Sequence, residues 1–389
     1  MPRDWVGDVV RTCVQDHPWD RPLVALQERI AGKELSGVEE RAVHHGVGNL
    51  VYLSLRSLTT DHEPIERLER RYLGGNLRHL QALAGLNNIA KVLGDRAIPW
   101  LVFKGPILAE IVYPRADLRS YRDLDILVPR SAFADAVRVL EAEGAKLLDR
   151  NWEFIVEREA GQLHFELPLG TLVDVHWHVL NRREIRRSLS VPVEGMFERA
   201  RAVEIDGTSL LTFDPIDSLL HLCLYAALSG GVRLIWLKDI ERLLASTPID
   251  WDELSIRARR WRAASPVAAV LARARRTLAM DAIPTDMIRE LAPARGGRAV
   301  DATVDAIWPV ESLASSRGPA ATWMRYRRDS FATGRETLRE RVALRRSLAA
   351  APPDDDAGDV MIFIPSGDET TKARFLEIVS GTGTNREHH

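Results

Sequence analysis

Cysteine is nearly absent from this chain of 389 residues, which contains only Cys13 and Cys223. Two cysteines are too few for a disulfide framework, and neither lies in a metal-ligand or nucleophile motif. Lysine is also scarce, because six of the 53 basic residues are lysine and the rest are arginine. A GC-rich coding bias is the simplest explanation of this imbalance. It draws attention to each lysine that remains.

Long apolar runs and a strong net charge are absent as well. No apolar run approaches the ~20 residues of a membrane-spanning helix, and the start, MPRDWVGDVV, lacks the layout of a secretory signal. The formal net charge is −2, so no global field attracts the protein to nucleic acid or to a membrane. We therefore expect a cytoplasmic globular protein with no membrane partner and no disulfide-linked partner.

Hydrophobic periodicity separates a mixed central region from helical regions on both sides. Helical spacing dominates residues 22–93, where one apolar stripe is formed by Leu73, Leu77, Leu80 and Ala84. Four apolar runs between residues 98 and 180 predict strands: PWLVF, LDILV, LHFEL and LVDVHWHV. Helical spacing then returns after Asp214 and continues to about residue 349.

This order predicts an α+β protein with a small mixed-sheet core flanked by N-terminal and C-terminal helical domains. The expected boundaries are an N-terminal helical domain at 1–94, the core at 95–212, a C-terminal helical domain at 213–350, and a linker and tail at 351–389. The linker leads to a short apolar run, VMIFI, whose packing partner the sequence does not identify.

Asp123 and Asp125 stand two positions apart in the strand LDILV. Alternate side chains of a strand share a face, so both carboxylates point to one side, roughly 7 Å apart. Like charges this close favour a cation between them, and hard oxygen ligands suit Mg²⁺ or Mn²⁺. A bare D-x-D pair is also common as two solvated aspartates at a strand end, so further features have to decide between these readings.

Three features favour the metal site. In LVDVHWHV, Asp174, His176 and His178 share one face of a second strand. In FKGPIL, Lys104 and Gly105 lie where a strand meets a helix, and backbone N–H groups at such a helix start hold phosphate. The loop before the D-x-D strand carries three arginines, each of which is also explained by solvent exposure: Arg115, Arg119 and Arg122.

The order of these motifs resembles the polymerase-β-type nucleotidyltransferase superfamily: a glycine turn that holds phosphate, then a D-x-D strand, then a single aspartate on a later strand. The chain more closely resembles the bacterial family usually labelled uncharacterised nucleotidyltransferase. The resemblance covers Arg41 to Ala245 and rests on IPWLVFKGPILAEIVYP, RSYRDLDILV, LVDVHWHV, LLHLCLYA and IWLKDI.

The resemblance implies a catalytic and metal-binding set of Asp123, Asp125 and Asp174, with the first two as ligands of two Mg²⁺ ions. Mn²⁺ is the alternative ion. An NTP such as ATP is the implied co-substrate, and a nucleoside monophosphate passes to an acceptor hydroxyl or other nucleophile with release of pyrophosphate. Asp174 is expected to bind the catalytic metal and to take the proton of the acceptor.

The resemblance also implies a set of nucleotide-binding residues: Lys104, Gly105, Arg122, His176 and Lys238. Gly105 matches the glycine that opens the phosphate-binding helix, and His176 flanks Asp174. The superfamily commonly has serine after this glycine, whereas this chain has Pro106, so Lys104 is expected to replace the phosphate contact of the serine. For Lys238, which precedes Asp239 in a helix, surface charge is an equally good explanation.

Other readings stay open at this stage. His176 and His178 form H-x-H, a spacing that also suits zinc in a metallohydrolase, although the sequence shows no second histidine-rich motif. Two arginine-rich segments could hold a polyanion, Asn181–Arg187 and Ser315–Arg346, the second with interleaved aromatic residues. A solvated amphipathic helix explains the second segment more simply.

Two classes of acceptor fit the sequence. One is a small molecule, and the other is the end of a tRNA or another RNA, as in nucleotidyltransferase toxins of toxin–antitoxin systems. A different kind of function also fits: a sensor or interaction module that binds NTP without catalysis, an alternative that Pro106 keeps open.

Overall fold

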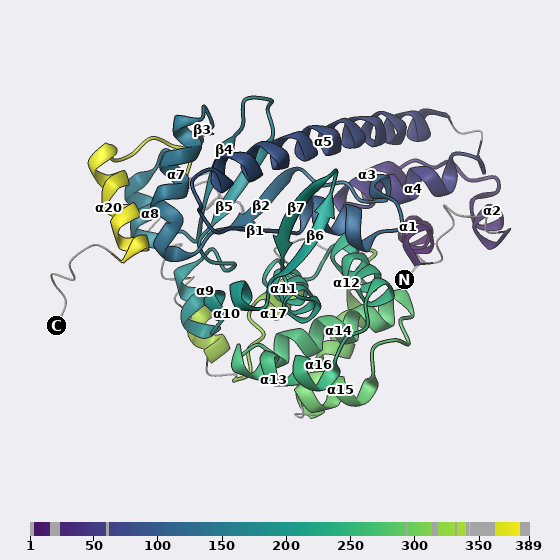
Figure 1. Ribbon diagram of the computed structural model, residues 1–389. Helices are drawn as coiled ribbons and strands as arrows, with labels where there is room; N and C mark the ends of the chain where they lie inside the picture. Colours follow the sequence, from purple (N-terminus) through teal and green to yellow (C-terminus); the bar gives the residue numbers. More distant parts are fainter. Residues whose placement is uncertain are drawn as a thin grey trace. The chain divides into compact units, whose positions relative to one another are not determined.

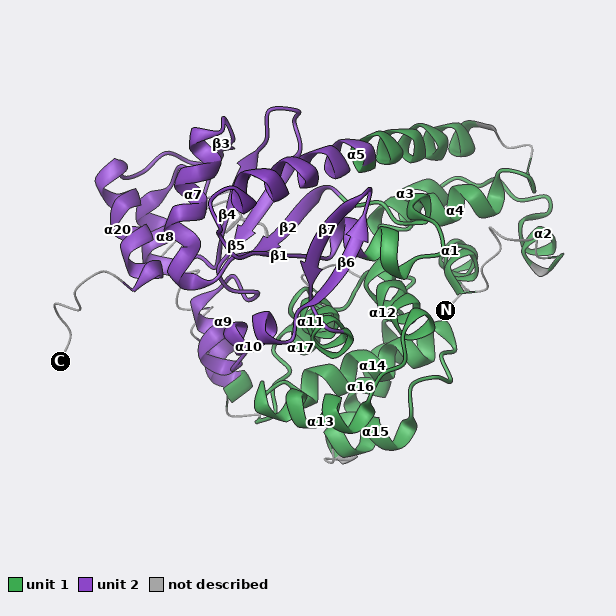
Figure 2. Ribbon diagram, viewed as in Figure 1, with its two compact units in different colours: residues 1–79, 108–121, 215–334 green, residues 80–107, 122–214, 335–389 purple. Residues whose placement is uncertain are grey.

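The computed structural model describes residues 4–15, 24–59, 62–292, 295–312, 318–330, 333–339, 342 and 362–381 (Figure 1). It divides into two compact units, coloured in Figure 2. Unit 1 combines residues 1–79, 108–121 and 215–334, and unit 2 combines residues 80–107, 122–214 and 335–389. The linker residues 351–361, the tail residues 382–389 and much of the segment Ser315–Arg346 lie outside the described residues.

Unit 1 is helical. Its described elements are α1 (Trp5–Gln15), α2 (Val24–Ile30), α3 (Val38–His44), α4 (Gly48–Leu55), the first part of α5 (His62–Gly94), the short helices η1 (Leu108–Val112) and η2 (Ala116–Leu118), α11 (Pro215–Leu228), α12 (Leu234–Ser246), α13 (Trp251–Arg260), α14 (Ala264–Leu278), α15 (Thr285–Leu291), α16 (Arg295–Ile307) and α17 (Pro319–Arg325). α11 begins with proline at its first position, where the missing N–H costs no helical hydrogen bond.

A buried ion pair joins the segment containing η1 and η2 to α12 inside unit 1. Arg119 donates from Nε and Nη2 to the two carboxylate oxygens of Asp239, at 2.8 and 2.9 Å. The hydroxyl of Tyr113 donates to Asp239 Oδ1 at 2.9 Å. All three side chains are buried. A buried charge has to be paired in this way, because burial without a partner is very costly.

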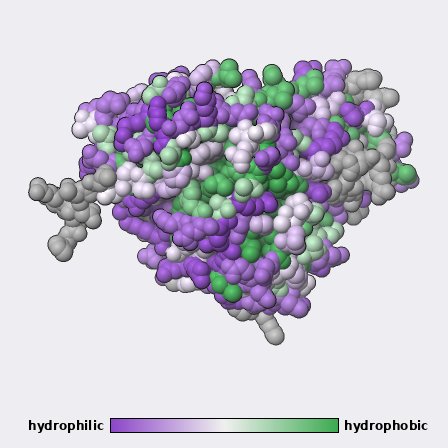
Figure 3. All heavy atoms as spheres, viewed as in Figure 1, coloured by the Kyte–Doolittle hydropathy of each residue, from purple (hydrophilic) through white to green (hydrophobic). Residues whose placement is uncertain are grey.

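The apolar stripe that the sequence shows on α5 faces outward. Leu73, Leu77 and Leu80 are 58%, 59% and 63% exposed, and Figure 3 shows apolar surface along this helix. The buried face of α5 is a different one, formed by Leu68, Ala82, Leu86, Ile89 and Leu93. The helix that the apolar spacing predicts is therefore confirmed. The side chains of α5 that pack into the core, however, are not those of the apolar stripe that the sequence shows.

Unit 2 contains a five-stranded mixed sheet in the order β1-β2-β5-β4-β3. The strands are β1 (Leu101–Phe103), β2 (Asp123–Leu127), β3 (Lys146–Leu147), β4 (Gln162–Glu166) and β5 (Leu172–His176). β2 and β5 are parallel, and the other neighbouring pairs are antiparallel. The α+β class and the four predicted strands are confirmed.

One face of this sheet is apolar and the other carries the polar side chains. Alternate residues of the three central strands are fully buried: Leu124 and Ile126 of β2, Val173 and Val175 of β5, and Leu163 and Phe165 of β4. Because side chains alternate across a strand, the residues between them share the opposite face. This alternation places the aspartates of β2 and β5 on one face of the sheet.

A second pair of strands, β6 (Arg201–Ile205) and β7 (Thr208–Thr212), forms a hairpin. Asp206 and Gly207 connect the strands with positive φ angles of 49° and 73°, as a two-residue hairpin turn requires. Phe213, which follows β7, stacks on Phe103 of β1 with ring centroids 4.9 Å apart. The hairpin therefore packs beside the edge strand that leads to Lys104.

The remaining described elements of unit 2 are the second part of α5, α6 (Gly105–Ile107), η3 (Arg130–Ala132), α7 (Phe133–Ala142), α8 (Trp152–Arg158), α9 (Arg183–Ser188), α10 (Val193–Glu198) and α20 (Glu369–Ser380). Figure 2 shows α20 beside α7 and α8. Phe375 of α20 is fully buried and lies 6.3 Å, between ring centroids, from both Phe133 and Trp152. The C-terminal helix therefore belongs to the hydrophobic core of unit 2.

The structure also shows a packing partner for the described part of the run VMIFI. The carbonyl of Ile362 accepts hydrogen bonds from the backbone N–H groups of Arg150 and Asn151, at 2.7 and 2.8 Å. Ser366 then pairs with Asn151 in an isolated bridge. The segment 362–366 is thus attached to the chain that connects β3 with α8.

Candidate metal and nucleotide site

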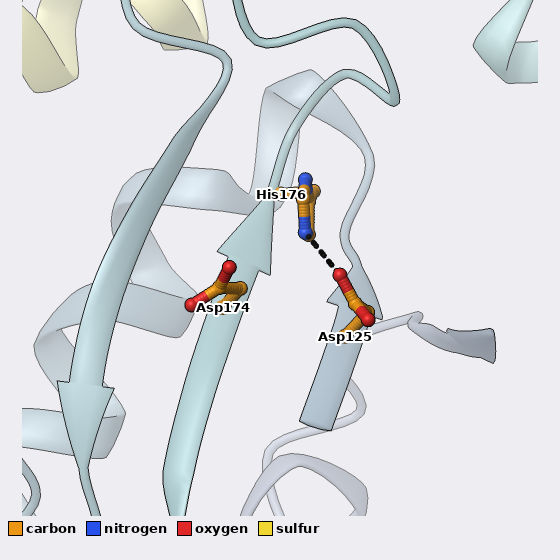
Figure 4. Close-up of side chains that lie close together, drawn as sticks. All are labelled: Asp125, Asp174 and His176. Atoms are coloured by element: carbon orange, nitrogen blue, oxygen red, sulfur yellow. Dashed lines mark hydrogen bonds and ion pairs between the residues drawn. The ribbon is translucent and has the colours of Figure 1, made fainter. Parts of the chain in front are cut away.

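The polar face of the sheet carries one row of ligand side chains across three strands. Asp125 of β2 is the register partner of Asp174 of β5, and Asp174 is the register partner of His164 of β4. Ligand atoms of Asp125, Asp174 and His176 all lie within 4.8 Å of one another (Figure 4). Two carboxylates and an imidazole this close form a donor set that fits a divalent cation.

Asp125 is the most deeply buried acid of this row, with a side chain that is 6% exposed. Lys104 Nζ lies 2.8 Å from its Oδ1, and His176 Nε2 donates to the same oxygen at 3.0 Å. Burial alone raises the pKa of Asp125, but the Lys104 ammonium and the His176 hydrogen bond outweigh it and hold this pKa well below its usual range. Asp125 is therefore a permanent negative charge.

Asp174 has the opposite electrostatic character. Its burial, together with the negative charges of Asp125 and Asp123, raises its pKa to about 8 against an opposing effect of His164. Gln162 donates a hydrogen bond to its Oδ2 at 2.9 Å. Two neighbouring carboxylates that cannot both ionise freely mark a place where a bound cation would be stabilising.

His176 is buried, and burial lowers its pKa although its hydrogen bond to Asp125 acts in the other direction. Its ring also packs against Phe103 at 5.1 Å between centroids. His178, the other histidine of H-x-H, lies outside the Asp125, Asp174 and His176 group. Its Nδ1 accepts from the backbone N–H of Leu180, and burial lowers its pKa to about 3.

Asp123 is the first residue of β2 and is half-buried. It contributes to the raised pKa of Asp174, so its charge acts on the same site, although the tight group of ligand atoms does not include it. Arg122 directly precedes it and is exposed. Both roles that the sequence assigns here, metal ligand for Asp123 and nucleotide contact for Arg122, stay predictions.

Lys104 and Gly105 form the turn between β1 and α6. Their φ angles are 55° and 32°, a left-handed conformation that glycine adopts freely and that costs a lysine conformational energy. The ion pair with Asp125 holds Lys104 in this turn. Pro106 follows at the start of α6 and has no backbone N–H to offer to a phosphate.

Lys238 lies in unit 1, and its side chain is completely buried. Its Nζ donates to the backbone carbonyl of Val14 at 2.8 Å and lies 2.8 Å from Glu241. The structure therefore places it in the packing of α1 against α12 inside unit 1. Its phosphate contact stays a prediction.

The sequence motifs did not single out His164, which lies on this face, or Asp149, which contacts it. His164 Nδ1 lies 3.0 Å from Asp149 Oδ1, and its Nε2 lies 3.9 Å from Asp174 Oδ1. The sequence does contain a pattern that could have pointed to His164. Gln162, His164 and Glu166 alternate with the buried Leu163 and Phe165, as expected of a strand with one polar face. Asp149, which lies between β3 and α8, has no such signal.

A profile of the family described as uncharacterised nucleotidyltransferase matches residues 37–279. The chain belongs to this family. It is accordingly a nucleotidyltransferase by family, and the Asp125 and Asp174 row lies within the matched residues. No curated protein matches the chain. Among its described residues, no helix is both long enough and apolar enough to cross a membrane.

A comparison with solved structures found similarity to a Thermotoga maritima CCA-adding enzyme complexed with tRNA. The two chains are 11% identical, and the match covers 81% of this chain and 92% of that chain with a TM-score of 0.18. A TM-score this low gives no support for shared structural detail.

Proposed function

We propose that this nucleotidyltransferase uses a divalent cation, Mg²⁺ or Mn²⁺, to transfer a nucleoside monophosphate from an NTP to an acceptor hydroxyl. The observation that supports the proposal is the Asp125, Asp174 and His176 group on the polar face of the sheet, with ligand atoms within 4.8 Å. Family membership supplies the class of reaction.

Each side chain of the site has a separate role in this proposal. Asp125 and Asp174, with Asp123 beside them, hold the cation and stay on rigid strands. A bound divalent cation would neutralise the triphosphate charge and lower the pKa of the acceptor hydroxyl. Asp174 would also accept the proton of this hydroxyl, the role that the family resemblance implies for the third carboxylate, because a bound cation would keep this carboxylate ionised.

In the transfer step, the acceptor oxygen attacks the α-phosphorus and forms a new P–O bond. The bond from the α-phosphorus to the oxygen that bridges to the β-phosphate breaks in line, and pyrophosphate leaves with these electrons. The proton of the acceptor passes to the carboxylate of Asp174. No covalent enzyme intermediate is needed, because positioning and charge neutralisation suffice.

Lys104 changes its partner in this scheme. Its ammonium is bonded to Asp125 at 2.8 Å, and a cation on the same carboxylate would compete with it. We propose that the released ammonium then contacts the triphosphate, which compensates for the contact that Pro106 cannot make. Gly105 allows the phosphates to approach the backbone closely, because it has no side chain.

The experiment is pyrophosphate release with each of the four NTPs and Mg²⁺ or Mn²⁺, offering total tRNA in one arm and a metabolite extract in the other. Asp125→Asn is the inactive variant. Asp135→Asn, which removes a mostly exposed carboxylate of the same unit, is the matched control and should behave like wild type.

Metal-dependent release that needs one acceptor pool and disappears in Asp125→Asn supports the proposal and identifies the acceptor class. A tRNA acceptor additionally predicts binding that weakens steeply with salt. NTP binding without release in any pool, with wild type matching Asp125→Asn, refutes catalysis on these acceptors and supports a nucleotide sensor.

A further inference from the structure

We infer that His164, oriented by Asp149, forms a second cation position with Asp174 that selects Mn²⁺-like transition ions over Mg²⁺. The inference deepens the proposed function and rests on it, because it gives the family's carboxylate site an additional imidazole ligand. It concerns residues of β4 and of the β3–α8 connection, which the motifs on β2 and β5 do not include.

The carboxylate of Asp149 determines which nitrogen of His164 can bind a metal ion. Asp149 is buried, its Oδ2 accepts the backbone N–H of His164, and its Oδ1 lies 3.0 Å from His164 Nδ1. A carboxylate can only accept here, so Nδ1 carries the proton and Nε2 carries the lone pair. Carboxylate–histidine pairs of this kind orient metal-binding imidazoles in many proteins.

Nε2 of His164 faces Asp174. The distance from Nε2 to Asp174 Oδ1 is 3.9 Å. Metal–nitrogen and metal–oxygen bonds of about 2.1 Å each allow two ligands of one ion to lie up to ~4 Å apart. One ion can therefore bind both atoms with only small movements of the side chains.

The amide of Gln162 marks the position between these two ligands. Its Nε2 lies 3.0 Å from His164 Nε2 and donates to Asp174 Oδ2 at 2.9 Å. Two acceptor atoms thus converge on one electropositive amide NH2 group, as they would converge on a cation. Rotation of the same amide would present its oxygen to an ion instead.

The imidazole ring of His164 is also fixed from another side. The ring of Phe363 lies edge-on against it, with centroids 5.8 Å apart, and the neighbouring Ile362 is hydrogen-bonded next to Asp149. A ligand held in this way loses little freedom when it binds a metal. Imidazole is a good ligand for first-row transition ions, whereas Mg²⁺ strongly prefers oxygen.

The test measures binding of Mn²⁺ alone, without nucleotide, by electron paramagnetic resonance of the free ion, with Mg²⁺ binding measured by calorimetry. We expect wild type to bind Mn²⁺ at two positions. We expect His164→Gln to weaken the second position by at least about tenfold, and Asp149→Asn to weaken it by a similar factor. Binding of Mg²⁺ should change less than threefold in either variant.

His79→Gln is the matched control, because His79 also pairs with a carboxylate, Glu110 at 2.7 Å, but in unit 1. It should leave Mn²⁺ binding unchanged. His164→Cys separates ligation from folding: the thiolate should lose Mn²⁺ at the second position and gain a thiophilic probe, Cd²⁺. A folded His164→Gln variant that binds Mn²⁺ like wild type overturns the inference.

The result is independent of the transfer reaction. Loss of one Mn²⁺ position in His164→Gln supports the inference even if no pyrophosphate is released. Release of pyrophosphate by a wild type whose Mn²⁺ binding does not depend on His164 would support the proposed function and refute the inference.

Discussion

The buried carboxylate of Asp239 provides a sharp test of the forces inside unit 1. Asp239→Asn keeps the shape of the side chain but removes the charge that faces Arg119. The Arg119 guanidinium is 9% exposed and donates hydrogen bonds to both carboxylate oxygens, at 2.8 and 2.9 Å. The variant leaves a buried cation without its counter-ion, and breaking a buried pair in this way costs about 3–5 kcal/mol. The hydrogen bond from Tyr113 belongs to the same network, so its contribution is not added separately.

The assay is urea unfolding at neutral pH, monitored by tryptophan fluorescence. Asp286→Asn is the matched control, since its pair with Arg289 is exposed, with side chains 91% and 63% accessible. Surface pairs contribute at most about 1 kcal/mol. Tyr113→Phe/Arg119→Met/Asp239→Leu replaces the whole network by apolar groups and should be far closer to wild type than Asp239→Asn. A loss below about 1 kcal/mol in Asp239→Asn would refute the reasoning.

Three further predictions concern single residues. Lys104→Met should lower the melting temperature in metal-free buffer, because Asp125 loses its counter-ion. Added Mn²⁺ should then raise the melting temperature of the variant more than that of wild type. Equal responses of the two proteins to Mn²⁺ in calorimetry would contradict this prediction. Burial, assisted by the charge of His44, lowers the pKa of His45 to about 3. Because the folded state binds this proton less readily than the unfolded chain does, the free energy of unfolding is highest above pH 6.5 and falls as the pH drops toward 3. His45→Gln should remove about 2 kcal/mol of the loss between pH 7 and pH 5, and an unchanged difference in urea titrations would count against it. Gly161→Ala should cost about 1–3 kcal/mol in the same titrations, since its Cβ would lie 2.7 Å from the carbonyl oxygen of Leu180; a neutral effect would show that this backbone contact relaxes.

Four of the five strands of the sheet could be predicted from local pattern, because they lie in runs of apolar or alternating residues, whereas β3 has only two residues and was not predicted. Val173 and Val175 alternate with Asp174 and His176, and this period of two fixes which side chains share a face. The hairpin of β6 and β7 was not predicted, although Asp206 and Gly207 are a typical two-residue turn. Several side chains of β6 and β7 are exposed, so these segments lack the apolar run that predicts a strand.

Long-range pairing explains most of what the sequence did not reveal. Asp149 lies on an irregular connection, and only the pairing of β3 with β4 brings it beside His164. Arg119 and Asp239 are 120 positions apart, so no local period relates them. Lys238 follows a helical pattern that fits a surface or a buried position equally well, and the packing of α1 against α12 decides it. Such contacts depend on tertiary structure, which overrides local propensity.

The central claim is that this protein transfers a nucleotidyl group, and label transfer tests it most directly. NTP labelled at the α-phosphate and NTP labelled at the γ-phosphate would each be incubated with Mn²⁺ and the acceptor pool. We predict that label from the α-position appears on the acceptor and that label from the γ-position leaves as pyrophosphate. We predict that Asp125→Asn neither labels the acceptor nor releases labelled pyrophosphate. Acceptor labelled from the γ-phosphate, or labelling that persists in Asp125→Asn, would contradict the account.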